Sequence, residues 1–206
     1  MIYPVRSPFI FRWWYHEAIW RMPVSGKKVY LTFDDGPHPS ITPYVLDQLE
    51  QYQAPAVFFC IGDNVQRFPE TYQLIRRKGH KTGNHTQHHV NGWHTPLETY
   101  IAEIREAAAC IDSTLFRPPY GRITKAQLRS LQATMPQLNV IMWDVLSGDF
   151  DPSIDADQCV SNVMRHVRAG SIIVFHDSEK AFPRLESALP IILKKLKAAG
   201  FEFALL

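Results

Sequence analysis

Short apolar runs rich in β-branched and aromatic residues alternate with helical patterns from residue 29 to the end of the chain. This alternation is typical of repeated βα units, because parallel strands need a crossover connection and a helix supplies it. The sequence predicts seven parallel strands, at Val29–Phe33, Ala56–Ile61, Lys81–Gly83, Thr114–Arg117, Gln137–Asp144, Ser171–His176 and Phe201–Leu205.

Helices are predicted between these strands, and glycines punctuate several of them. Gly79, Gly170 and Gly200 each follow a helical pattern, where a residue in the left-handed conformation ends a helix. Such a chain forms either an open doubly wound sheet or a closed, barrel-like ring, and in both the functional loops follow the C-terminal ends of the strands. The predicted helices cover residues 42–53, 68–79, 96–111, 124–134, 155–168 and 183–199.

Composition narrows the classes of function. A chain of 206 residues fits one domain with a substantial core. Its formal net charge of +2, without a dense run of lysine or arginine, argues against nucleic acid as a partner. Cys60, Cys110 and Cys159 lack any C-x-x-C spacing, so neither a disulfide framework nor a thiolate metal site is indicated.

The first 28 residues are rich in aromatic side chains. Charged residues interrupt the run "FIFRWWYHEAIWRM" at 9–22, so we expect neither a signal peptide nor a transmembrane segment. Such a segment lies at a membrane interface, stacks on sugar rings or packs on the domain, and we expect the third. Residues 1–28 are thus predicted to be an extension that packs on a catalytic domain of residues 29–206. Without a visible signal peptide a cytoplasmic location is favoured, and association with the cell envelope is the alternative.

Two adjacent carboxylates, Asp34 and Asp35, follow the first predicted strand. Consecutive residues at a strand end point in different directions, so one carboxylate is available to bind a metal and the other to transfer a proton. An Asp-Gly-Pro turn is the competing interpretation, because these residues are common in turns.

His85 and His89 follow the third strand, four residues apart. On one helical turn both imidazoles would face the same way and share a cation, as in zinc hydrolases, although a surface pair without a ligand has the same spacing. A hydrolytic metal commonly takes two neutral nitrogens and a carboxylate and keeps positions open for water and substrate. One of the two aspartates would complete that set.

Further polar residues are predicted at the same edge: Arg117, Tyr120, Asp144, Asp149, His176 and Asp177. His176 follows the apolar run "SIIVF" and is either a core histidine or a general acid, since imidazole has an ordinary pKa of about 6.5. Arg117 and Asp149 carry complementary charges. They form either a structural salt bridge or a pair in which Arg117 orients an active-site carboxylate and Asp149 holds Arg117.

Together these residues resemble the motifs of the polysaccharide deacetylase family, which are metal-dependent carbohydrate esterases. Five motifs occur in order: "TFDDG" at 32–36, "HTQHH" at 85–89, "RPPYG" at 117–121, "SGDF" at 147–150 and "VFH" at 174–176. The resemblance implies a distorted, incomplete (β/α) barrel with about seven parallel strands and a substrate groove across their C-terminal face.

By this resemblance Asp34 is the catalytic base and His176 the catalytic acid. Asp35, His85 and His89 bind a divalent metal, zinc in the first place and cobalt, nickel or manganese as alternatives.

Two further roles are implied by the family. Arg117 and Asp149 position Asp34, and the backbone N–H of Tyr120 contributes to an oxyanion site. His88 receives no role. Phe150 stands where the family usually has tryptophan, and Val174 where leucine is commoner; both keep apolar character.

The implied reaction removes N-linked acetyl groups from N-acetylglucosamine-containing saccharides of the chitooligosaccharide or peptidoglycan type. A metal and Asp34 activate water to attack the acetyl carbonyl, and His176 protonates the leaving amine. An O-deacetylase of the acetyl-xylan esterase type would use the same residues, and an inactive saccharide-binding module is the alternative from another class. The expected partner is an N-acetylated saccharide.

Overall fold

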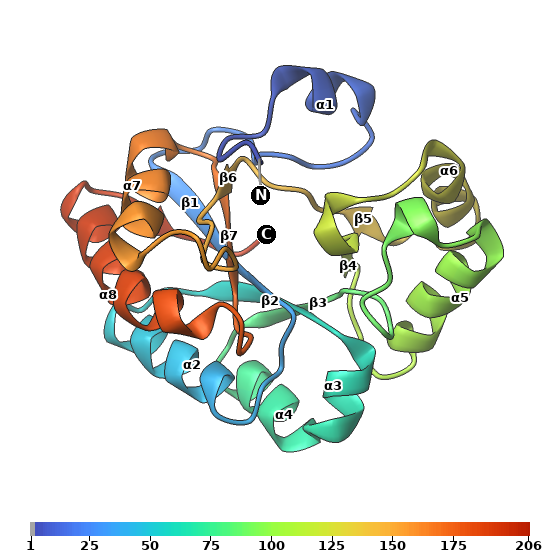
Figure 1. Cartoon of the computed structure of the whole chain (residues 1–206), viewed down its shortest axis with the longest axis horizontal. Helices are drawn as coiled ribbons and strands as arrows, with labels where there is room; N and C mark the ends of the chain where they lie inside the picture. The colour runs from blue at the N-terminus through green and yellow to red at the C-terminus, as the bar shows by residue number, and fades with distance from the viewer. Residues whose placement is uncertain (1–2) are drawn as a thin grey trace.

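Seven parallel strands form a curled sheet at the centre of the computed structural model, which describes residues 3–206 (Figure 1). The order across the sheet is β5-β4-β3-β2-β1-β7-β6, and an eighth strand, β8, pairs with the start of β1. Because these pairings are parallel, the C-terminal ends of the strands share one edge. The strands are β1 Lys28–Asp34, β2 Ala56–Cys60, β3 Lys81–Asn84, β4 Leu115–Phe116, β5 Asn139–Val140, β6 Val145–Leu146, β7 Ile172–His176 and β8 Glu202–Phe203.

Helices surround the outer face of this sheet (Figure 1). The sheet does not close on itself, since β5 and β6 are its two ends. The expected distorted, incomplete (β/α) barrel of about seven parallel strands is therefore confirmed. The helices are α1 Phe9–Trp14, α2 Ile41–Gln51, α3 Gly62–Arg67, α4 Pro69–Arg77, α5 Leu97–Ala108, α6 Lys125–Thr134, α7 Ala156–His166 and α8 Phe182–Ala198, with the short 3-10 helices η1 Gly92–His94 and η2 Pro119–Gly121.

Side chains on β1 alternate between the two faces of the sheet, as in any strand. Val29, Leu31 and Phe33 belong to the core that the sheet shares with α2, α7 and α8. Tyr30 instead packs in a separate cluster with residues of β2, β4 and β7 inside the curl. Asp34 has the same parity as Tyr30, so the strand delivers it to the inward face.

The N-terminal segment is hydrogen-bonded to both ends of the sheet. Beside β6, Leu146 donates its backbone N–H to the carbonyl of Val5 at 2.8 Å. Beside β5, Ile19 donates to the carbonyl of Val140 at 2.8 Å. One segment therefore covers two strand edges that would otherwise present unpaired backbone groups.

The prediction of a single strand over Gln137–Asp144 is wrong. Only β5 lies within that range, and β6 follows it as a separate strand that was not predicted. The apolar run looked continuous because the chain between the two strands, residues 141–144, crosses from one end of the sheet to the other and stays buried apart from Trp143. Helices α1 and α3 were also not predicted.

Asp144 does not lie at the functional edge, contrary to expectation. It is fully buried and accepts hydrogen bonds from Arg168 at 3.2 Å and from Ser171 Oγ at 2.7 Å, and it pairs with Arg12. Ser171 directly precedes β7, so this cluster sits at the N-terminal end of that strand. The carboxylate fastens the N-terminal segment to the barrel.

Candidate active site

Asp34, the last residue of β1, is buried inside the curled sheet and held by an arginine. Its Oδ1 accepts a hydrogen bond from Arg117 Nη1 at 2.6 Å. The same nitrogen donates to Thr32 Oγ1 at 2.8 Å. Thr32 lies two residues before Asp34, so the alternation of the strand brings both acceptors to one guanidinium.

Arg117 follows β4 and is fully buried. Its Nε donates to the carbonyl of Ile141 at 3.2 Å and its Nη2 to that of Met142 at 3.1 Å, while the guanidinium lies 4.1 Å from the centre of the Phe59 ring. Burial lowers the pKa of Arg117, and the ion pair with Asp34 opposes that shift. The surroundings fix the guanidinium on all sides, so it orients the Asp34 carboxylate.

Asp35 turns away from Asp34 because its backbone is in the left-handed region, at a φ of 78°, which is uncommon for a residue with a side chain. Its Oδ1 lies 3.2 Å from His89 Nε2 and 3.7 Å from His85 Nε2. Burial alone would raise the pKa of Asp35, but the hydrogen bond from His89 and the charges of neighbouring histidines outweigh it and hold that pKa well below its usual range.

The two histidines do not share a helical turn, so that expectation is wrong. They converge through a loop after β3, in which Thr86 and His89 have φ values of 66° and 56°. His85 Nδ1 lies 2.7 Å from the carbonyl oxygen of Arg117 and donates to it, which leaves Nε2 facing Asp35. Burial lowers the pKa of His85 to about 4, so this imidazole is neutral near pH 7.

Asp35, His85 and His89 fit a divalent metal ion. One donor atom from each lies within 4.8 Å of the other two. Two imidazole nitrogens and one carboxylate oxygen suit zinc and neighbouring first-row ions, and the carbonyl that holds His85 is the usual outer support of such a ligand. His88 points elsewhere: its ring lies 2.9 Å from Glu103, and its backbone N–H donates to the same carboxylate at 2.8 Å.

His176, at the end of β7, pairs with Asp149. Its Nδ1 lies 2.7 Å from Asp149 Oδ1, and its backbone N–H donates to Asp149 Oδ2 at 2.8 Å. Burial alone would lower the pKa of His176, but the charge and hydrogen bond of Asp149 outweigh it and raise that pKa to about 9. The expectation that Asp149 holds Arg117 is therefore wrong: the structure pairs this carboxylate with the histidine.

Aromatic side chains line two sides of these groups. The Tyr120 ring is 60% exposed, lies 4.6 Å from the His89 ring and belongs to a residue with a φ of 58°. The Phe150 ring lies 5.2 Å from the His176 ring, and Tyr3 of the N-terminal segment packs 5.0 Å beyond it. Tyr120 is the exposed one of the three, and an exposed aromatic ring beside polar groups is well suited to stack on a sugar ring.

Sequence reasoning placed Asp177 at the functional edge but gave it no role; it is fully buried next to the loop that follows β1. Its Oδ2 accepts a hydrogen bond from Thr42 Oγ1 at 2.5 Å, and burial raises its pKa to about 7. A β-carbon on Gly36 would come within 2.1 Å of this carboxylate, so only glycine fits there. Thr32 was missed. The available signals were the position of Asp177 directly after His176 and that of Thr32 at the start of "TFDDG".

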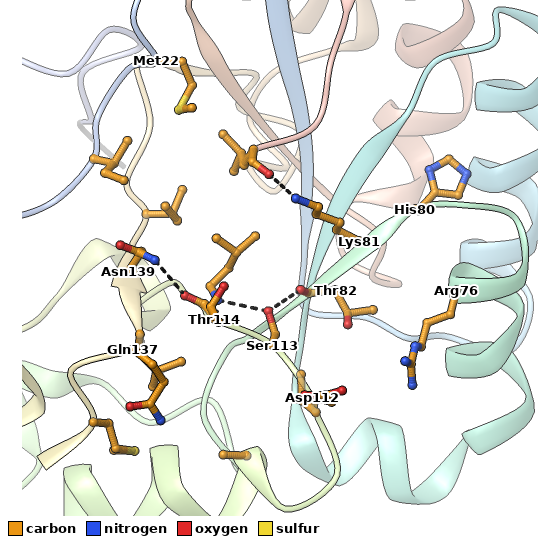
Figure 2. A pocket seen from close by; sticks show the side chains of 18 residues that line it. Met22, Arg76, His80, Lys81, Thr82, Asp112, Ser113, Thr114, Gln137 and Asn139 are labelled. Atoms are coloured by element: carbon orange, nitrogen blue, oxygen red, sulfur yellow. Dashed lines mark hydrogen bonds between the residues drawn. The ribbon is translucent and has the colours of Figure 1, made fainter.

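A cavity of about 800 Å³ opens far from these groups (Figure 2). Lys81, Leu115 and Asn139, which begin β3, β4 and β5, line it. It therefore lies at the N-terminal ends of the strands. In Figure 2, Lys81 points across it, and its Nζ donates to the carbonyl of Leu206 at 2.6 Å. None of the candidate catalytic or metal-binding residues lines this cavity.

Comparison with known proteins identifies the family. A family model described as polysaccharide deacetylase matches residues 21–136. The chain belongs to this family. A peptidoglycan-N-acetylglucosamine deacetylase of Bacillus cereus is 33% identical over 190 residues, which cover 89% of this chain and 88% of that protein. A chitooligosaccharide deacetylase of Bradyrhizobium sp. is 37% identical over 199 residues, covering 87% and 89%.

Solved structures agree with the sequence comparisons. The crystal structure of the Bc1960 peptidoglycan N-acetylglucosamine deacetylase matches this polysaccharide deacetylase with a TM-score of 0.87 at 31% identity, over 97% of this chain and 95% of that one. The chain is thus similar over nearly its whole length to a hydrolase that acts on N-acetyl groups. No helix among residues 3–206 is both long enough and apolar enough to span a bilayer.

Proposed function

We propose that this chain is a metal-dependent hydrolase that removes N-linked acetyl groups from N-acetylglucosamine-containing saccharides, of the chitooligosaccharide or peptidoglycan type. The observation that carries the proposal is the arrangement of two separately held groups, Asp34 on Arg117 and His176 on Asp149, beside one candidate metal centre. The substrates named for the two curated relatives support the choice of sugar.

Asp35, His85 and His89 would hold the ion. Zinc suits this donor set best, and cobalt, nickel or manganese are the alternatives. When bound, such an ion supplies Lewis acidity, which polarises an acyl oxygen and makes water easier to deprotonate.

Asp34 is proposed as the general base. It is adjacent to Asp35 in the chain but has a different partner, because the Arg117 pair orients it independently of the ligands. In the folded protein this carboxylate is buried and oriented for proton abstraction from water.

His176 is proposed as the general acid. Asp149 accepts from Nδ1, which leaves Nε2 to donate a proton to the departing amine. An amide nitrogen leaves poorly until it is protonated, so N-deacetylation needs such a group. The raised pKa of about 9 keeps the imidazole protonated near neutral pH.

Tyr120 is proposed to stabilise the oxyanion through its backbone N–H, as family membership implies. Its left-handed backbone supports this role, because a non-glycine residue in that conformation is uncommon and such residues cluster at functional sites.

Two alternatives make different predictions. An O-deacetylase would use the same residues and would release acetate from acetylated xylan in preference to chitooligosaccharides. A catalytically inactive binding module would release none. The second alternative has a precedent in this fold, since a solved neighbour at 24% identity is described as a pseudoenzyme.

The test is an acetate-release assay with the purified, metal-loaded protein on chitooligosaccharides, peptidoglycan fragments and acetylated xylan. Release from the first or second substrate supports the proposal. Release from xylan alone supports the O-deacetylase, and no release from any of them rejects an enzymatic function.

A further inference from the structure

Helix α1 exposes a cluster of large apolar side chains that the proposed deacetylation does not use. Phe9 is 80% exposed, Ile10 63%, Phe11 47%, Trp13 62% and Trp14 55%. We call these five residues the aromatic ridge. The other large apolar side chains exposed among residues 3–206 are scattered singly, at Val24, Trp93, Tyr120 and Ile191. A contiguous exposed apolar cluster marks an interaction site far more often than single exposed residues do.

Side-chain contacts hold the helix that carries the ridge against the barrel. Arg12 is the α1 residue that turns inward: its guanidinium pairs with buried Asp144 and donates to the carbonyl of Ser7 at 3.0 Å. Just after the helix, Tyr15 donates its hydroxyl to the carbonyl of Ile123 at 2.7 Å. No residue of α1 itself is buried. In Figure 1, α1 projects from the outside of the molecule at the N-terminal end of the colour scale.

The shape of the ridge is convex. At about 100° per residue, the five side chains spread over roughly 200° of the helix circumference, and Arg12 lies in the remaining arc. A stable protein–protein interface buries about 800 Å² on each partner, and side chains spread over so wide an arc of a six-residue helix cannot all contact one flat partner surface. A fluid lipid surface, in contrast, closes around a projecting group of side chains.

The chemistry of the segment also favours lipid. Tryptophan and phenylalanine are the side chains that favour the boundary between head groups and acyl chains. Residues 3–16 include Arg6 and Arg12 and contain no aspartate or glutamate. The carboxylate beneath them, Asp144, is buried, and the nearest acid in the chain, Glu17, pairs with Lys125. Arg6, Arg12 and Arg168 share the single buried carboxylate of Asp144. This side of the molecule therefore keeps an excess of positive charge, which suits anionic head groups.

We propose that the aromatic ridge docks this protein onto an anionic lipid bilayer surface, with the ring side chains inserted at the head-group boundary. The six-residue helix is about 9 Å long, which allows insertion into one face of the bilayer only.

The experiment is flotation of the full-length protein with vesicles of phosphatidylcholine, with and without phosphatidylglycerol. The double variant W13A/W14A removes two exposed side chains, so we expect an unchanged far-ultraviolet circular dichroism spectrum. Trp93→Ala, which removes an exposed tryptophan elsewhere, is the matched control. We expect wild type and the control to float with anionic vesicles and the double variant to bind about tenfold more weakly or worse.

Two outcomes would overturn the proposal. One is that wild type and the double variant float equally with the vesicles, or that neither of them floats. The other is a concentration-dependent dimer that W13A/W14A abolishes without any vesicle binding by wild type, which would assign the ridge to a second copy.

Discussion

Asp149 accepts two hydrogen bonds from His176, one from the ring Nδ1 at 2.7 Å and one from the backbone N–H at 2.8 Å. The carboxylate thus fixes both the orientation of the imidazole and its protonation state. The proposed general acid is therefore a pair of residues, and its function would depend on a group that need not touch the substrate.

Asp149→Asn should move the alkaline limb of the pH–rate profile to lower pH. The charge of Asp149 raises the pKa of His176 to about 9, so a protonated acid persists up to that pH in the wild type. Without the charge, protonation should be lost nearer the ordinary imidazole value of about 6.5. The measurement is acetate release between neutral and alkaline pH, with Asp155→Asn as the control. An unchanged alkaline limb would contradict this role of Asp149.

The same pair gives stability at low and neutral pH. Because the folded-state pKa of His176 lies above its unfolded value, its contribution is fully present below about pH 6.5 and is lost as the pH rises through about 9. Wild-type protein should therefore lose more stability over that window than Asp149→Asn does, as urea unfolding at both ends of the window would show.

Arg117→Met should destabilise the protein by about 3–5 kcal/mol, because it leaves the buried Asp34 carboxylate without its partner. The double variant R117M/D34N should recover part of that loss, since it removes the uncompensated charge. Urea unfolding of wild type, both single variants and the double variant measures the coupling. Simple additivity of the two single changes would show that the ion pair is not energetically coupled.

Replacing one candidate metal ligand should abolish tight metal binding. We expect Asp35→Ala and His89→Ala to lose bound zinc in dialysis followed by elemental analysis, because each removes one of three donors. His88 directly precedes His89 in the loop after β3, and His88→Ala should retain the ion, since His88 bonds to Glu103 instead. Loss of zinc from His88→Ala would contradict this ligand set.

Asp144 should make the protein more sensitive to acid. Burial alone would raise its pKa, but hydrogen bonds from Arg168 and Ser171 and the charge of Arg12 outweigh it, so the pKa lies below the ordinary value. As the pH falls, the Asp144 carboxylate is therefore protonated in the unfolded state before it is protonated in the folded state. Its contribution to the free energy of unfolding is fully present above about pH 4 and is lost as the pH falls through the folded-state pKa.

Asp144→Asn should be less stable than wild type at pH 7, and the difference should shrink on acidification. Thermal unfolding at several pH values measures it. A difference that is constant with pH would show that the charge of Asp144 plays no part.

The sequence predicted the direction of side chains along a single strand well, but it predicted poorly which side chains from different strands pair with each other. The alternation on β1 predicts that adjacent aspartates diverge, and Asp34 and Asp35 do diverge. Spacing predicted that His85 and His89 converge, although the backbone achieves this through left-handed residues of a loop and not through a helix.

The partner of Asp149 depends on which strand ends are neighbours. From the sequence, the only basis for choosing a partner was opposite charge, and this led to the prediction that Asp149 pairs with Arg117. The sheet order β1-β7-β6 instead brings Asp149, which follows β6, beside His176 at the end of β7. Strands β5 and β6 have two residues each, which is too short to show a hydrophobic period in the sequence. Helix α1 was not predicted because its apolar side chains are exposed and do not follow the pattern of a helix that packs on the core.

The central claim is that Asp34 acts as base beside a metal bound by Asp35 and the two histidines. The most direct measurement is acetate release from a chitooligosaccharide by wild type and Asp34→Asn, with bound metal quantified in the same samples. The account predicts loss of activity by about a hundredfold or more with metal content unchanged. Loss of the metal from Asp34→Asn, or full activity with metal bound, would contradict it.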